Sequence, residues 1–183
     1  MKTPIYFIDG EVVAESGNVK VYEFNEKLFL ERGPGHNLWA DSDELLEYAD
    51  QLGNRPRGDC LEIGLGLGTA SRYILSFDEV LSLTTVELLI DVVAVHKMVN
   101  TIEDERHSIV IMNGFDYMLQ CGKKFHYIFM DFYDLIDEET VLGLRQAVRV
   151  AKQILHEGGK IQAWFDPSTP REFSEEFDKI IGG

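Results

Sequence analysis

The sequence predicts an α/β fold, a Rossmann-like parallel sheet preceded by a small N-terminal β-hairpin meander. From residue 59 onwards, short apolar runs alternate with helical segments, as in a parallel sheet with right-handed crossovers. The first apolar run leads into Gly64, Gly66 and Gly68, and a helical segment follows these glycines. A strand, a glycine turn and a helix in this order are typical of the nucleotide-binding end of such a sheet.

The bulk composition fits a single principal domain with a real core. The chain has 183 residues and a formal net charge of −15, from 17 basic and 32 acidic residues. This charge disfavours nucleic acid as a partner and would suit a cationic small molecule such as an amine, although it also serves general solubility. Because the sequence has two cysteines, no signal-peptide pattern and no long apolar run, we expect a cytoplasmic protein without a membrane partner.

Residues 1–40 are predicted to form the hairpin region, and residues 41–183 the Rossmann-like domain. Within the hairpin region, apolar alternation and turn residues predict four strands, at residues 5–8, 11–14, 19–24 and 27–30. A loop is expected over residues 33–39 and a helix over residues 42–52. Since the alternating apolar faces of the hairpins need cover, we expect them to pack against the Rossmann-like domain or a second subunit.

The Rossmann-like domain is predicted to contain five strands with helices between them. The expected strands are residues 59–63, 81–87, 107–112, 125–131 and 160–165. The expected helices are residues 69–75, 90–99, 115–119, 138–157 and 171–181. The glycine pair Gly158-Gly159 is taken as the end of the fourth helix.

Four candidate binding residues fall at predicted strand ends, namely Gly64, Glu87, Asn113 and Asp131. Ligands of parallel α/β sheets bind at this edge, and a carboxylate about 20 residues past the glycine turn can accept both ribose hydroxyls. The dinucleotide fingerprint of oxidoreductases does not fit in either register, because Thr69 or Ser71 stands where it needs glycine or alanine. A tight strand-to-helix turn without a ligand is the alternative interpretation.

Two motifs carry a family resemblance. Glu62 precedes the glycines in an E-x-G-x-G-x-G pattern, and Val86-Glu87 ends the second strand, which resembles class I S-adenosylmethionine-dependent methyltransferases. The order of features resembles the spermidine synthase branch, whose Asp-Gly-Phe-Glu-Tyr and Asp-x-x-Asp stretches match residues 113–117 and 131–134. The resemblance implies S-adenosylmethionine or its decarboxylated form as cofactor, bound by Glu62, Gly64, Gly66, Gly68, Glu87, Leu88, Asn113, Gly114 and Asp131.

The resemblance also implies catalytic roles for Asp131 and Asp134, which in that branch hold the aminopropyl amine and help to deprotonate the attacking amine. Leu67 departs from the pattern, because the branch has there an aspartate that holds the aminopropyl amine. We therefore expect methyl transfer to a small, possibly cationic acceptor, with aminopropyl transfer and a non-catalytic cofactor-binding module as alternatives. No metal site is expected, and a homodimer is possible.

Overall fold

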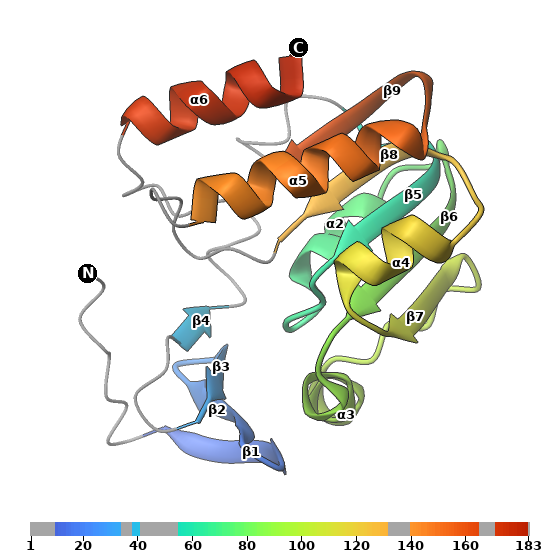
Figure 1. Cartoon of the computed structure of the whole chain (residues 1–183). Coiled ribbons are helices and arrows are strands. Elements are labelled where there is room, and N and C mark those ends of the chain that lie inside the picture. The colour runs from blue at the N-terminus through green and yellow to red at the C-terminus, as the bar shows by residue number, and fades with distance from the viewer. Residues whose placement is uncertain (1–9, 34–37, 41–54, 132–139, 165–170, 183) are drawn as a thin grey trace.

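The computed structural model describes residues 10–33, 38–40, 55–131, 140–164 and 171–182. A five-stranded parallel sheet in the order β7-β6-β5-β8-β9 forms the centre of the molecule (Figure 1). Its strands are β5 (Gly58–Ile63), β6 (Val80–Glu87), β7 (His107–Ile111), β8 (Phe125–Met130) and β9 (Leu155–Ala163). A separate antiparallel sheet, the N-terminal sheet, has the order β1-β2-β3-β4 and contains β1 (Glu11–Ser16), β2 (Val19–Phe24), β3 (Lys27–Arg32) and β4 (Leu38–Ala40). The predicted fold class is confirmed.

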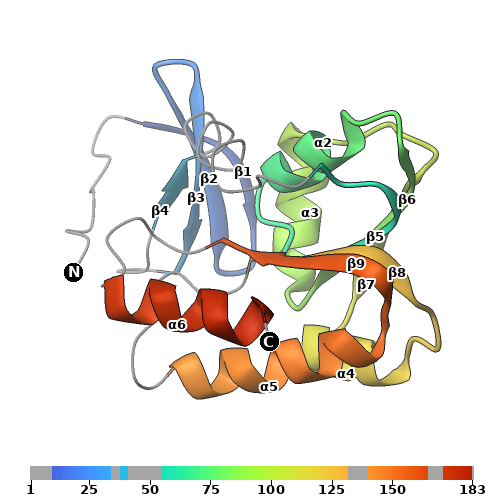
Figure 2. The same ribbon diagram turned by 90° about the horizontal axis from the view of Figure 1, so that it is seen from above.

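Helices cover both faces of the parallel sheet, which buries its central strands. Figure 2 shows labelled helices on opposite sides of the sheet. The first face carries α2 (Thr69–Leu75) and α3 (Ile90–Val99), and the second carries α4 (Gly114–Gln120), α5 (Thr140–Gln153) and α6 (Arg171–Gly182). Leu61 of β5 and Ile128 of β8 are fully buried, as the continuous apolar runs of these strands require. No helix among the described residues is long and apolar enough to cross a membrane.

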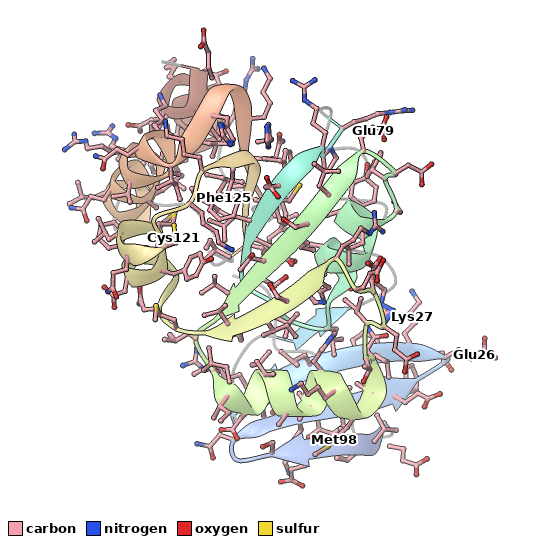
Figure 3. All side chains as sticks on the ribbon, turned by 90° about the vertical axis from the view of Figure 1, so that its right-hand side faces the viewer. Glu26, Lys27, Glu79, Met98, Cys121 and Phe125 are labelled. Carbon is pink, nitrogen blue, oxygen red and sulfur yellow. The ribbon has the colours of Figure 1, made fainter. Side chains whose placement is uncertain are left out.

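The N-terminal sheet is docked on helix α3, as Figure 3 shows. Leu30 of this sheet shares one buried cluster with Leu65 of the glycine turn and Val92 of α3. The Ser16 hydroxyl donates a 2.7 Å hydrogen bond to the Asp91 carboxylate in the first turn of α3. The expectation that the hairpins pack against the Rossmann-like domain is therefore confirmed.

The strand that ends the parallel sheet begins earlier than predicted. Helix α5 ends at Gln153 and β9 starts at Leu155, so the prediction that Gly158-Gly159 stops the helix is wrong. Leu155 pairs with Phe125, whereas Lys160 pairs with Tyr127, and β9 therefore accommodates extra residues in an irregularity. Gly158, at φ 72°, lies within this irregularity, so the glycines serve the strand.

The loop predicted for residues 33–39 is also partly wrong. Residues 38–40 form β4, which pairs antiparallel with Phe29–Glu31. Three residues are too few to display a strand pattern, so only the pairing with β3 reveals them. The strand predicted at residues 5–8 and the helix predicted at residues 42–52 lie outside the described residues.

Candidate functional site

A cavity of about 510 Å³ opens at the carboxyl edge of the parallel sheet. In Figure 1 the arrowheads of β5 and β8 point towards the side on which the N-terminal sheet lies. The cavity is lined from both sheets, and its polar or glycine lining includes Arg32, Gly64, Gly66, Glu87, Asn113 and Asp131. Its volume lies within the range of roughly 300–1,000 Å³ found for small-molecule sites. The four candidates at predicted strand ends therefore meet at one cavity.

The glycine turn brings backbone close to this cavity. Gly64 has a φ of 99°, and a Cβ there would collide with the backbone carbonyl of Asp131. Gly66 has a φ of 50°, and a Cβ there would have no neighbour within 4 Å, because it would project into open space. Gly68 does not line the cavity. A Cβ added at Gly68 would lie only 2.5 Å from the His96 ring of α3, so glycine lets this helix pack closely. Gly64 thus allows the strands to approach, and Gly66 leaves room for a ligand.

Glu87 ties the end of β6 to the glycine turn. One carboxylate oxygen accepts a 3.0 Å hydrogen bond from the Leu65 N–H, and the other accepts a 2.8 Å bond from the Leu89 N–H. The side chain is buried and borders the cavity. Each carboxylate oxygen has further acceptor capacity, so Glu87 is fixed in place and can still accept ligand hydroxyls. The neighbouring Leu88 lines the cavity and is 57% exposed, which places it at the rim.

Glu62 lies in the sheet and is not part of the cavity lining. It is fully buried and accepts hydrogen bonds from the hydroxyls of Ser71 and Thr85, the latter at 2.6 Å. The pKa of Glu62 is raised to about 8, and burial is the largest cause. The two hydrogen bonds lower this pKa, whereas Asp131 and Glu87 raise it by smaller amounts. Glu62 therefore connects the first turn of α2, through Ser71, to β6, through Thr85.

Asn113 is the N-cap of helix α4. Its Oδ1 accepts hydrogen bonds from the N–H groups of Phe115 at 2.9 Å and Asp116 at 3.3 Å. Because the oxygen is engaged in this way, the Nδ2 group is the part of the amide that can contact a ligand. Gly114 lines the cavity beside it, and a Cβ at Gly114 would collide with the Ile63 side chain.

Asp131 follows β8 directly and is positioned by its backbone. Its N–H donates a 2.8 Å hydrogen bond to the Ile63 carbonyl, which holds the residue beside the glycine turn. The side chain is half-buried and lines the cavity. Asp134, the second predicted catalytic residue, lies outside the described residues. No group of three or more metal-binding side chains occurs among the residues that the structure describes.

Sequence reasoning missed the contribution of the N-terminal sheet to the cavity. Leu30 and Arg32 of β3 line it, together with Leu67 of the glycine turn and Trp164 after β9. The signal for Leu30 and Arg32 was the alternation along β3, which places both side chains on one face. The alternation shows that Leu30 and Arg32 lie on the same face of the strand, but it does not show that this face borders the cavity.

Comparisons with known proteins relate residues 53–167 to the family model of the spermine/spermidine synthase domain. Spermidine synthase from Thermotoga maritima matches with 20% identity and a TM-score of 0.72, over 93% of this chain and 63% of that one. A spermidine synthase in complex with the transition state analogue AdoDATO matches with 19% identity and a TM-score of 0.70, over 93% and 62%.

A protein described as a methyltransferase, solved with SAH, matches with 16% identity and a TM-score of 0.61, over 93% of this chain and 48% of that one. The chain thus spans about three fifths of the length of the spermidine synthases that it matches. A comparison with curated protein sequences found no match.

Proposed function

The chain belongs to the spermine/spermidine synthase domain family, and on this premise we propose that it binds S-adenosylmethionine and transfers its methyl group to a small, positively charged acceptor. The observation that carries the proposal is the convergence of Gly66, Glu87, Asn113 and Asp131 on one cavity. They come from the ends of four different strands or the turns after them. Only the parallel topology brings them together, and this edge is where such sheets bind nucleotides.

The residues around the cavity fit the parts of this cofactor. Glu87 accepts the ribose hydroxyls, since its carboxylate is held rigidly by Leu65 and Leu89 and keeps acceptor capacity. Asn113 donates from Nδ2 to a ring nitrogen of the adenine, because its oxygen caps α4. The open space at Gly66 admits the cofactor at the turn, where a side chain would occupy that space.

Leu67 favours methyl transfer over aminopropyl transfer. It lines the cavity, is 5% exposed, and occupies the position where the spermidine synthase branch has an amine-binding aspartate. An apolar side chain provides no acceptor for the ammonium group at the end of the chain that aminopropyl transfer would move, so the site lacks a contact that would orient this chain for attack. Asp131 is the carboxylate that we assign to a cationic group in this part of the site.

The chain's own residues have two tasks in the reaction. When bound, the cofactor supplies a methyl carbon that its sulfonium centre makes electrophilic. Glu87 and the glycine turn hold the nucleoside, so that this carbon has a fixed position. Asp131, half-buried at the cavity wall, attracts the cationic acceptor and takes up the amine proton at its carboxylate, so that a neutral nitrogen faces the methyl carbon.

The reaction products test this proposal. The protein is incubated with a panel of small amines and either S-adenosylmethionine or its decarboxylated form, and nucleoside products are separated by chromatography. Acceptor-dependent formation of S-adenosylhomocysteine is expected. Acceptor-dependent methylthioadenosine from the decarboxylated cofactor alone would instead support aminopropyl transfer, which the family and Asp131 also permit. Binding without turnover of any amine would support a non-catalytic module, and absence of binding would reject the proposal.

A further inference from the structure

We propose that Arg32 binds the α-carboxylate of S-adenosylmethionine, so that the site selects the carboxylated cofactor over its decarboxylated form. This inference rests on the proposed function, because it takes the cavity to be the cofactor site. It adds a contribution from the N-terminal sheet, which lies outside the matched residues 53–167.

The alternation along β3 directs Arg32 towards the cavity. Leu30, two residues earlier, is 1% exposed and packs in a cluster with Leu65 and Leu67 of the glycine turn. Residues two apart in a strand share one face of the sheet. Arg32 therefore continues the inward-facing row, and both Leu30 and Arg32 line the cavity.

The end of β3 that carries Arg32 is fixed at several points. Arg32 lies opposite Val19 in the β2–β3 ladder, and the Gly33 N–H donates a 2.6 Å hydrogen bond to the Asn18 carbonyl. The neighbouring Ser16 is bonded to Asp91 of α3. The opposite end of β3, at the hairpin tip labelled by Glu26 and Lys27 in Figure 3, is remote from these anchors. Arg32 thus lies at the anchored end of β3, in a sheet that packs on α3.

The charges around the cavity identify the kind of group that Arg32 would bind. Among the described lining residues, Arg32 is the one lysine or arginine, beside the two carboxylates of Glu87 and Asp131. Arg32 makes no salt bridge with any other residue in the described ranges. A guanidinium at the wall of a binding cavity matches a carboxylate through two parallel hydrogen bonds.

The two forms of the cofactor differ in this one group. S-adenosylmethionine carries a carboxylate besides its sulfonium and ammonium, whereas the decarboxylated form carries the two cations alone. The first therefore offers a partner to Arg32, and the second offers none. Loss of the carboxylate removes an attraction to Arg32 and leaves a more positively charged ligand beside a cation.

Calorimetry on the full chain tests the inference with three ligands: S-adenosylmethionine, its decarboxylated form, and methylthioadenosine, which lacks both the amine and the carboxylate. The wild type should bind S-adenosylmethionine more tightly than the decarboxylated form by roughly tenfold, the lower end for a hydrogen bond to a charged group, because Arg32 is exposed to solvent. Arg32→Met should abolish this preference and leave the affinity for methylthioadenosine unchanged. Arg32→Lys should retain part of the preference.

The matched control is Lys20→Met, which removes a positive charge from the same sheet. Lys20 lies between the buried Val19 and Val21, so it points to the opposite face, and it pairs with Glu15. This variant should keep the wild-type preference. Equal affinity of the wild type for both cofactor forms, or an Arg32→Met variant that weakens all three ligands alike, would overturn the inference while leaving the proposed function standing. Failure of all three ligands to bind would refute the proposed function and the inference together.

Discussion

Replacement of Glu62 by glutamine should change how the stability of the protein depends on pH. Glu62 is fully buried, and its Oε1 has no hydrogen-bond partner among the described residues. An ionised carboxylate with one oxygen that accepts no hydrogen bond is unfavourable in the protein interior. Burial therefore raises the pKa of Glu62 from 4.5 to about 8. The carboxyl group is therefore protonated in the folded protein at neutral pH and ionised in the unfolded chain.

The sign and size of the effect follow from this difference. Between pH 4.5 and 8 the folded state holds a proton that the unfolded state has released, so the free energy of unfolding falls as pH rises. Burial lowers the pKa of His107 from 6.5 to about 4, which gives the opposite slope below pH 6.5. Above pH 6.5 the Glu62 contribution is therefore separate from that of His107, and it amounts to at most about 1.4 kcal/mol per pH unit.

Glutamine imitates the protonated carboxyl group, because its amide oxygen can accept the hydrogen bonds of Ser71 and Thr85. Urea unfolding without ligand, followed by the fluorescence of the buried Trp164, should be measured between pH 6.5 and 8. Over this range the wild type should lose up to about 2 kcal/mol relative to Glu62→Gln. Glu79→Gln, which removes an exposed carboxylate, controls for the change in net charge. A constant difference between wild type and Glu62→Gln would show that Glu62 is ionised in the folded state, and would refute the argument.

Three further variants test the site. Gly66→Ala should weaken cofactor binding in calorimetry about tenfold or more, whereas the control Gly122→Ala should leave it unchanged. Both glycines have positive φ and open space at the Cβ, so the two variants introduce similar backbone strain. If Gly66→Ala and Gly122→Ala bound the cofactor equally tightly, the ligand would not reach the turn. Glu87→Gln should weaken binding of the nucleoside by roughly 1.5 kcal/mol or more, the range for hydrogen bonds to a charged group, and an unchanged dissociation constant would place the ribose elsewhere. Asp131→Asn should lower turnover about a hundredfold, as loss of an acid–base group does, with little change in melting temperature; full activity in the variant would show that the assigned chemistry is wrong.

The sequence was sufficient for the parallel sheet because its signals are local. The apolar runs of β5 and β8, the glycine turn and the acid at the end of β6 each appear within a few residues, and parallel topology then places their ends at one edge. The resemblance to the spermidine synthase branch, drawn from the same motifs, is confirmed by the family match over residues 53–167.

The sequence was insufficient where long-range pairing decides the structure. Strand β4 exists because Leu38–Ala40 finds the edge of β3, and β9 begins early because Leu155 pairs with Phe125. The hydrogen bonds of Asn113 likewise depend on the first turn of α4, and its place at a predicted strand end did not reveal that Oδ1 would cap a helix. Each of these features needs a partner that residue patterns do not specify.

The two sheets make different contributions to the proposed chemistry. The parallel sheet supplies Glu87, Asn113 and the glycine turn, which fit a nucleoside and do not distinguish one sulfonium cofactor from another. The proposed distinction depends on Arg32, which would give a partner to the carboxylate that S-adenosylmethionine carries and its decarboxylated form lacks. The docking of the N-terminal sheet on α3 brings Arg32 to a cavity whose other charged lining residues are Glu87 and Asp131, and the proposed selectivity rests on this arrangement.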